Sequence, residues 1–283
     1  GIGSVAVGHN TLKALKDGGV SNTAIGFKAS LNIVTDDNNV SVGYYALRDM
    51  HGGSNVAVGK DALMGASFTD STCDTANTDS TVTHDANANI VAGLGVTGAG
   101  IGDGNYIASI TNSTTFELQV AASATATNVT LTFYSRTSNS VAIGTDALTA
   151  VTTGTSNVAV GHEALTAVTT GAQNTAIGYQ AMKDLTVSSD NTAIGYLAGA
   201  EMVVGGATPS NNVYVGSHSG RYMDDGVGNV AVGRSAMLGN SSEGNAGEYN
   251  VALGYAALTA VTDGSSNTIV GAYAGDAITT GEL

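Results

Sequence analysis

The sequence has little of what builds a thick globular core or a membrane span. Its 283 residues include no tryptophan, one proline and only 11% charged residues, against 39 glycines. Large side chains are too scarce to fill a wide interior, so we expect a fold that is thin in cross-section. No apolar run approaches the ~20 residues of a membrane helix, which argues against insertion into a membrane.

Thiols and positive charge are scarce as well, and this excludes further kinds of site. Cys73 is the only cysteine, so an intrachain disulfide and a metal site of paired thiolates are both excluded. Nine Lys and Arg residues stand against 23 Asp and Glu residues, for a net charge of −14. Nucleic-acid binding needs a basic surface that displaces counterions, so we predict that the chain does not bind nucleic acid.

What the sequence does contain is an internal repeat marked by one glycine. Most successive motif glycines are 16–18 residues apart, two intervals span 21 residues, and one spans 85. The motif glycines are Gly8, Gly26, Gly43, Gly59, Gly144, Gly161, Gly178, Gly195, Gly216, Gly233, Gly254 and Gly271. Asparagine stands four residues earlier, at Asn22, Asn39, Asn55, Asn157, Asn174, Asn191, Asn212, Asn229, Asn250 and Asn267, and serine replaces it at Ser4 and Ser140.

Each repeat predicts one coil of a β-solenoid. Val or Thr, usually Ala, and then Val, Ile or Leu precede the glycine, and this alternation indicates a short strand. The glycine predicts a corner where a Cβ would clash or φ is positive. An apolar pair such as Ala147-Leu148 then predicts a second short strand, and a polar turn closes the coil. We expect the asparagines of successive coils to form a hydrogen-bonded ladder.

The apolar side chains of one coil offset only part of the entropy cost of ordering it. We therefore expect a second buried face against a neighbouring chain. The alanine before Val or Ile is small enough for chains to approach closely at this face.

The repeat resembles that of a known family. Asn-Val-Ala-Val-Gly at 157–161, Asn-Thr-Ala-Ile-Gly at 174–178 and Ser-Val-Ala-Ile-Gly at 140–144 resemble the head repeats of YadA-type trimeric adhesins. The longer 17-residue form, with Ala-Leu after the glycine, resembles repeats in bacteriophage tail fibres. The resemblance covers residues 1–66 and 140–283. It implies a left-handed parallel β-roll of about twelve coils, three chains around one axis, and a role in attachment.

The 85-residue interval predicts an inserted domain. It holds one coil and about 68 further residues, so we divide the chain into a first part of the roll at 1–66, an insert at 67–139 and a second part of the roll at 140–283. After a polar stretch from Ser67 to Asn89, strands are expected at 90–96, 106–111, 115–120 and 129–134, which favours a small antiparallel β-domain. The insert enters and leaves at a closing turn, so the coils of Gly59 and Gly144 should stack directly.

No motif predicts a catalytic residue, a cofactor or a metal site. Residues 93–98 match the dinucleotide fingerprint, but no helix is expected to follow. Residues 216–220 have His218 where a nucleophile elbow has serine. His9 and His162 directly follow motif glycines and are expected on the outer surface, with an axial metal site in a trimer as the alternative.

Two acidic pairs are expected in solvated turns. They are Asp36-Asp37 and Asp224-Asp225. A weak Ca²⁺ site and glycoside hydrolysis are the alternatives for these carboxylates.

Aromatic residues recur directly after the motif glycine and are candidate glycan contacts. They are Phe27, Tyr44, Tyr179, Tyr196 and Tyr255. Neighbouring members should stack in successive coils. Cross-coil packing that stiffens the roll is the first interpretation, and stacking on sugars is the alternative.

These features favour a structural or attachment protein over an enzyme. The first hypothesis is the shaft of a phage tail fibre or similar virion appendage. Such a shaft would be a parallel homotrimer on the virion surface. It would join other fibre proteins and display elements that bind host-surface glycan. The alternatives are the head of a bacterial trimeric adhesin at the cell surface and a tailspike glycosidase. Solenoid ends need caps, and the sequence shows none, so we expect it to be part of a longer polypeptide.

Overall fold

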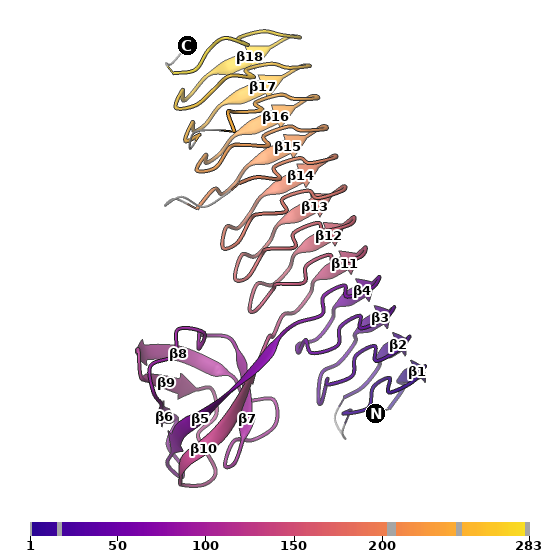
Figure 1. Ribbon diagram of the computed structural model, residues 1–283, viewed down its shortest axis with the longest axis vertical. Coiled ribbons are helices and arrows are strands. Elements are labelled where there is room, and N and C mark those ends of the chain that lie inside the picture. Colours follow the sequence, from indigo (N-terminus) through magenta and orange to yellow (C-terminus); the bar gives the residue numbers. More distant parts are fainter. Residues whose placement is uncertain (1, 16–18, 203–207, 242–244, 281–283) are drawn as a thin grey trace. The chain divides into compact units, whose positions relative to one another are not determined.

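The computed structural model describes residues 2–15, 19–202, 208–241 and 245–280. Within these residues the fold is entirely β and contains no helix. A twelve-stranded parallel sheet and a six-stranded antiparallel sheet are formed (Figure 1). The predicted fold class, a parallel β-solenoid with an inserted antiparallel β-domain, is confirmed. Contacts divide the chain into two compact units, Gly1–Asn55 with Met64–Ser138, and Val56–Leu63 with Asn139–Leu283.

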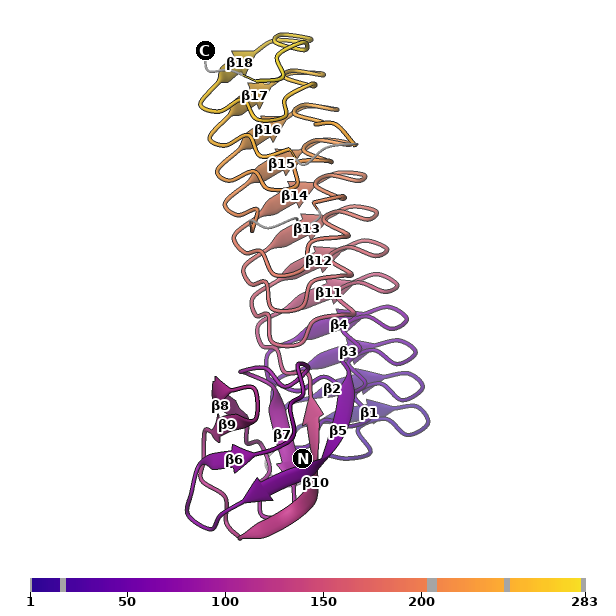
Figure 2. The same cartoon turned by 60° about the vertical axis from the view of Figure 1, so that its left-hand side comes forward.

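Each strand of the parallel sheet has three residues and ends directly before a motif glycine. The strands are β1 (Val5–Val7), β2 (Thr23–Ile25), β3 (Val40–Val42), β4 (Val56–Val58), β11 (Val141–Ile143), β12 (Val158–Val160), β13 (Thr175–Ile177), β14 (Thr192–Ile194), β15 (Val213–Val215), β16 (Val230–Val232), β17 (Val251–Leu253) and β18 (Thr268–Val270). The sheet follows this order, with β4 next to β11 (Figure 2). Val56 pairs with Val141, so the coils on either side of the insert stack directly, as predicted.

The motif glycine lies at a close approach between successive coils. Its φ is 138° at Gly161, in the left-handed half of conformational space that favours glycine. A Cβ built on Gly161 would lie 2.3 Å from the carbonyl oxygen of Gly178. Backbone strain and steric conflict therefore both exclude a side chain here.

The asparagine before most strands forms the predicted ladder inside the coil. Asn174 is fully buried. Its backbone N–H donates to Asn157 Oδ1 at 3.0 Å, and its Nδ2 donates to the same oxygen at 3.2 Å and to the Ser188 carbonyl at 2.8 Å. Asn191 repeats these contacts on Asn174. Each amide thus satisfies buried backbone groups of two neighbouring coils.

The alanine in the middle of most strands faces the interior, which corrects the expectation that it faces a neighbouring chain. Ala159 and Ala176 have no exposed surface, whereas Ile177, one residue later, is 38% exposed. The interior also receives the leucine or methionine that stands four residues after most motif glycines, such as Leu165. The interior of a coil this thin holds the layer of large residues after the glycine and only a small residue opposite it. The alanine of the strand therefore points inward, and the larger aliphatic residues on either side of it point outward.

An exception supports this account of the interior. Tyr214 replaces alanine in β15 and is fully buried. Four residues after the motif glycines of this coil and the preceding one, glycine replaces leucine, at Gly220 and Gly199. A Cβ on Gly220 would lie 2.3 Å from the Tyr214 ring. The tyrosine therefore occupies the volume that leucine fills elsewhere.

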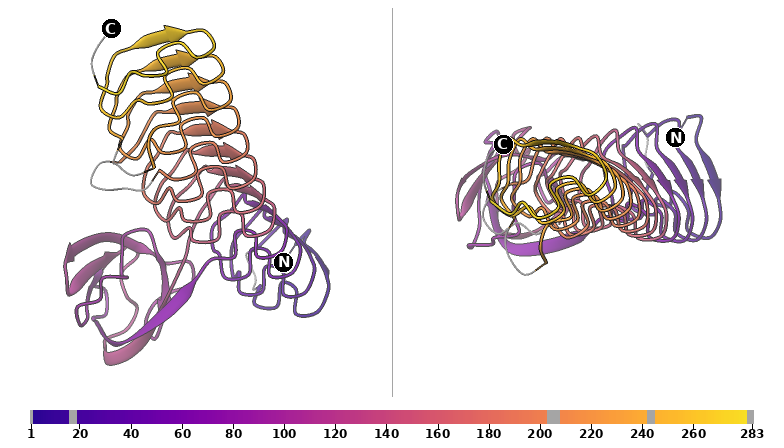
Figure 3. Two further views of the ribbon diagram at one scale, coloured as in Figure 1. Left: turned by 45° about the horizontal axis from the view of Figure 1, so that its top comes forward. Right: turned by 90° about the horizontal axis from the view of Figure 1, so that it is seen from above.

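The apolar pair after the glycine is not a strand, contrary to the prediction. Residues alternate into left-handed backbone there, with a φ of 56° at both Asp146 and Leu148. The N–H of Asp146 donates to the Lys60 carbonyl of one neighbouring coil, and that of Leu148 donates to the Ala164 carbonyl of the other, each at 3.1 Å. Left-handed leucine costs about 1–2 kcal/mol, which the complete burial of Leu148 offsets. Successive coils from β11 to β18 repeat this path (Figure 3).

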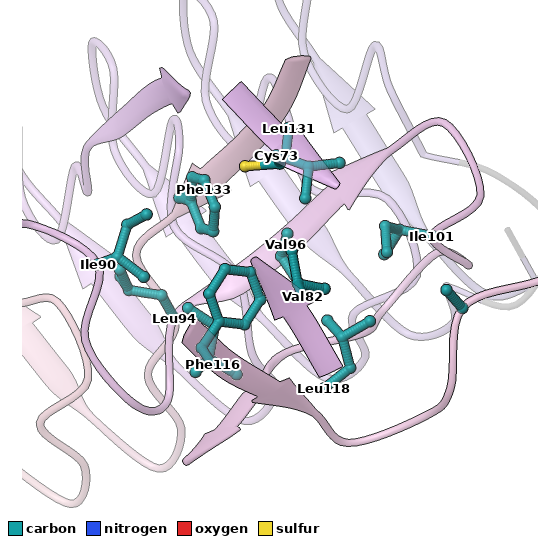
Figure 4. Packing of buried hydrophobic residues seen from close by; sticks show 12 residues of the cluster. Cys73, Val82, Ile90, Leu94, Val96, Ile101, Phe116, Leu118, Leu131 and Phe133 are labelled. Atoms are coloured by element: carbon teal, nitrogen blue, oxygen red, sulfur yellow. The ribbon is translucent and has the colours of Figure 1, made fainter. Parts of the chain in front are cut away.

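The inserted sheet has the order β7-β10-β5-β6-β9-β8. Its strands are β5 (Ser67–Thr75), β6 (Thr81–Thr83), β7 (Gly95–Gly98), β8 (Ile107–Asn112), β9 (Thr115–Leu118) and β10 (Ala126–Tyr134). It encloses a separate core that includes Phe116, Leu131 and Phe133 (Figure 4). Two differences from the prediction stand out: the polar stretch after Ser67 forms β5 and β6, and residues 90–94 form turns.

The insert joins the roll through a short pair of hydrogen bonds. The Ser135 N–H donates to the Ala66 carbonyl at 2.9 Å, and the Ala66 N–H donates to Ser135 Oγ at 3.1 Å. Directly beyond, the Thr137 carbonyl accepts from Asn55 Nδ2 at 3.0 Å. Residues 135–138 therefore already follow the path of the roll.

Replacing Gly161 by Ala should destabilise the fold by more than about 1 kcal/mol, because φ is incompatible and the carbonyl of the next coil blocks the Cβ. Gly102→Ala is the matched control, since nothing lies within 4 Å of a Cβ there. Chemical denaturation of both variants measures the effect. Equal denaturation midpoints of the two variants would contradict the conclusion that this position excludes a side chain.

Asn174→Ala should also destabilise, by about 1–3 kcal/mol for each buried group left unsatisfied. Asn174→Ser should lose less, because Ser140 occupies the same position naturally and accepts from the Asn157 N–H through Oγ at 3.3 Å. Thermal unfolding of the two variants ranks them. Identical losses would show that the side-chain oxygen contributes nothing to the ladder.

Candidate functional site

The aromatic residues after the motif glycines stack in successive coils. In the first unit, the ring centroids of Phe27 and Tyr44 are 5.3 Å apart, with His9 stacked on Phe27. In the second unit, Tyr179 and Tyr196 are also 5.3 Å apart, with His162 stacked on Tyr179. The interplanar angles in these stacks are 9–12°. The rings therefore cover one another's faces.

This stacking bears on the glycan hypothesis for these side chains. The rings remain 38–50% exposed, but the face of each inner ring is occupied by its neighbour. A sugar that packs on an aromatic face would reach only the ends of each stack. Tyr255 differs, since it meets Tyr273 edge-on and its hydroxyl accepts from Arg234 at 2.8 Å. The geometry favours cross-coil packing for the rows.

A pocket of about 250 Å³ lies in the first unit, between closing turns of the roll and the inserted sheet. Its roll side consists of Ala14, Asn32, Val34, Thr35, Asp49 and His51. Its other side consists of Ser67, Thr97, Asp103, Gly104, Thr132 and Tyr134. Thr132 pairs with Thr97, and Tyr134 pairs with Ser67, so neighbouring strands present these residues together.

His51 is the most constrained residue of the pocket. Its Nδ1 lies 3.0 Å from Asp36 Oδ2, and its ring packs on Tyr134 with centroids 3.9 Å apart. The backbone N–H of His51 donates to the Ser135 carbonyl at 2.9 Å, and its carbonyl accepts from the Thr137 N–H at 2.8 Å. Ring and backbone are thus both held. Asp36 lies behind the ring and does not line the pocket.

Asp36 is therefore not the solvated turn residue expected from the sequence. Its side chain is only 14% exposed, and its Oδ1 accepts from the Gly52 N–H at 2.9 Å. Burial raises the pKa of Asp36, but the hydrogen bonds from His51 and Gly52 and the charges of His51 and Arg136 outweigh it and hold the pKa below 3.8. Asp37 is also engaged, since its Oδ1 accepts from the Val20 N–H at 2.7 Å.

Two further polar groups of the pocket are the carboxylate of Asp49 and the phenol of Tyr134. Asp49 accepts from Asn32 Nδ2 and from Arg48 Nε. Burial raises the pKa of Tyr134 to about 12, so its phenol stays protonated at neutral pH.

The sequence did not predict this pocket, because its residues come from three coils and several strands and share no spacing.

A second grouping joins Asp146, His162 and Glu163, whose potential ligand atoms all lie within 4.8 Å of one another. Glu163 also accepts from Gln180 Nε2, and His162 is exposed. The sequence did not predict this cluster, because Asp146 belongs to the preceding coil, 16 residues before His162. Acidic groups near the surface gather readily in an acidic chain, and the cluster on its own does not define a metal site.

The remaining sequence motifs lie in ordinary strands and turns. Residues 93–98 lead into β7 rather than a helix. His218 lies in a turn and its Nδ1 contacts Ser217 Oγ at 2.8 Å. Asp224 and Asp225 are half-buried in a turn.

Comparisons of the chain with protein-family models, curated proteins and solved structures found no match. Among the described residues, no helix has the length and apolarity needed to cross a membrane.

The ion pair of Asp36 predicts a specific acid sensitivity. Because the folded-state pKa lies below 3.8, the contribution of the ionised carboxylate to stability is complete above that value. It is lost as pH falls from there through the folded-state pKa. Asp36→Asn should remove this part of the pH dependence, so its melting temperature should fall less than that of the wild type below about pH 4. Parallel melting curves in acid would contradict the assignment.

Proposed function

We propose that this chain is a shaft segment of an attachment protein, a phage tail fibre or similar virion appendage, that assembles as a parallel homotrimer and displays elements that bind the host surface. One observation carries the proposal. The outward-facing aliphatic residues of the short strands form an apolar row that repeats once in every coil. A soluble chain that exposes such a row needs a partner to cover it.

The row is formed by the residue directly before each motif glycine. In the second unit it comprises Ile143, Val160, Ile177, Ile194, Val215, Val232, Leu253 and Val270. Ile143, Ile177 and Ile194 are 38–39% exposed. Two residues earlier, Val or Thr points to the same side of the strand, because side chains alternate with period two. The outer face of the sheet is thus mostly apolar, with threonine hydroxyls at Thr175, Thr192 and Thr268.

The periodicity of this face indicates its partner. Successive rungs of a parallel sheet are about 4.8 Å apart, and a surface with ridges at that spacing is matched by another surface of the same spacing. A second copy of this chain offers one. Identical chains arranged in parallel around an axis bury this face in a closed ring of equivalent contacts. The resemblance to trimeric adhesin heads supports three chains in that ring.

The connection of the insert supports display. The insert leaves and re-enters at a single closing turn, between Ala66 and Ser135. Because β4 pairs directly with β11, the hydrogen-bonding ladder of the roll does not depend on the insert. A shaft can therefore carry an additional domain without losing its own continuity. Such a protein would act at the virion surface, among other fibre proteins.

The double variant Ile177→Lys/Ile194→Lys should abolish the trimer, because two charges per chain would be buried at the interface. Val187→Lys is the matched control: Val187 is 41% exposed, much like Ile177 and Ile194 at 38%, but lies in a closing turn. Native mass spectrometry of the three proteins distinguishes the outcomes. A folded wild-type monomer at micromolar concentration would overturn the proposal.

A further inference from the structure

The inserted sheet has two faces of different chemistry. One face buries the core that contains Leu131 and Phe133 (Figure 4). In β10 the alternate residues Thr132 and Tyr134 point the other way and line the pocket, with Thr97 on one neighbouring strand and Ser67 on the other. A covered sheet face is normally apolar, whereas this one presents hydroxyl groups to a partly open pocket. The hydroxyls are thus available to a polar ligand.

The opposite wall presents groups that are already held in place. Asp36 engages Nδ1 of His51, so the free polar atom of that ring is Nε2. The Asp49 carboxylate is oriented by Asn32 and Arg48. Pre-organised polar groups bind a ligand without a further ordering cost. The pocket is therefore a built site rather than a loose gap.

The composition of the walls defines the ligand class. Hydroxyls donate and accept, carboxylates accept, and the phenol of Tyr134 donates. A ligand rich in hydroxyl groups satisfies all of them. Asp49 and Asp103 line the pocket, whereas no Lys or Arg does, so an anionic ligand is disfavoured. Ala14 and Val34 supply apolar surface for the C–H groups of a ring.

The size of the pocket sets a further limit. Its volume of about 250 Å³ lies below the ~300–1,000 Å³ of sites for drug-sized ligands. One sugar ring fits this space, whereas several rings do not. We propose that the pocket binds a single neutral sugar residue, an aldohexose or N-acetylhexosamine unit of a surface glycan. This inference rests on the proposed attachment function and names its ligand class.

The test uses the full chain and saturation-transfer NMR with methyl glycosides of glucose, galactose, mannose and N-acetylglucosamine. The decisive variant is Thr132→Phe, which fills the pocket. Its matched control is Thr130→Phe, on the same face of β10 but exposed and outside the lining. We expect saturable binding of at least one glycoside to the wild type and to Thr130→Phe, and none to Thr132→Phe. N-acetylneuraminic acid, an anionic sugar, should not bind.

Binding that survives Thr132→Phe, or no binding of any of the four glycosides to the folded wild type, would overturn the proposal. So would tighter binding of the anionic sugar than of the neutral ones. Native mass spectra of the same samples keep the two proposals separate. A trimer that binds no glycoside overturns only the pocket, whereas a monomer that binds one overturns only the assembly, since a single chain supplies every lining residue.

Discussion

The contact between one motif glycine and the carbonyl of the next coil is the constraint on which the rest of the roll depends. Because no Cβ fits between Gly161 and Gly178, successive coils can approach only in this register. The register then brings like residues into rows: asparagine and alanine inside the coil, aliphatic residues outside it, and aromatic rings beside the glycine. Buried amide pairing, interior packing and the apolar outer face all follow from that single close approach.

Much of the roll was readable because the same pattern occurs twelve times. The strand, the glycine corner, the asparagine ladder and the direct stacking across the insert all follow from spacing and residue type. The direction of the alanine does not, because period-two alternation shows that two faces differ without showing which one is inside. The left-handed leucine is also unreadable, since an apolar pair such as Ala147-Leu148 has the same pattern in a strand and in a buried turn.

The insert was less readable, because it has no repeat to average over. Its strand β5 is mostly Ser, Thr and Asp, and Phe68 and Cys73 are its hydrophobic contributions to the core. Such a polar stretch has no hydrophobic signal. The pocket was even less predictable from the sequence than the strands of the insert. Asp36 and His51 meet because one coil separates them, and Tyr134 joins them from the far end of the insert. Local composition favours solvated turns for these residues, and tertiary packing overrides it.

The repeating rows of the roll and the single pocket beside the insert suit different kinds of binding. A row with the spacing of the coils matches another surface of that spacing, which suits assembly with copies of the same chain. It offers no single concave site for a small ligand, and in the aromatic rows the rings cover one another. The pocket occurs once per chain, where the repeat is interrupted and loops meet a sheet. In the proposed trimer, one weak site per chain would become three, and their simultaneous engagement would raise the avidity through effective concentration. Under the proposed function, the roll would serve assembly, and the region where the insert meets the roll would serve recognition.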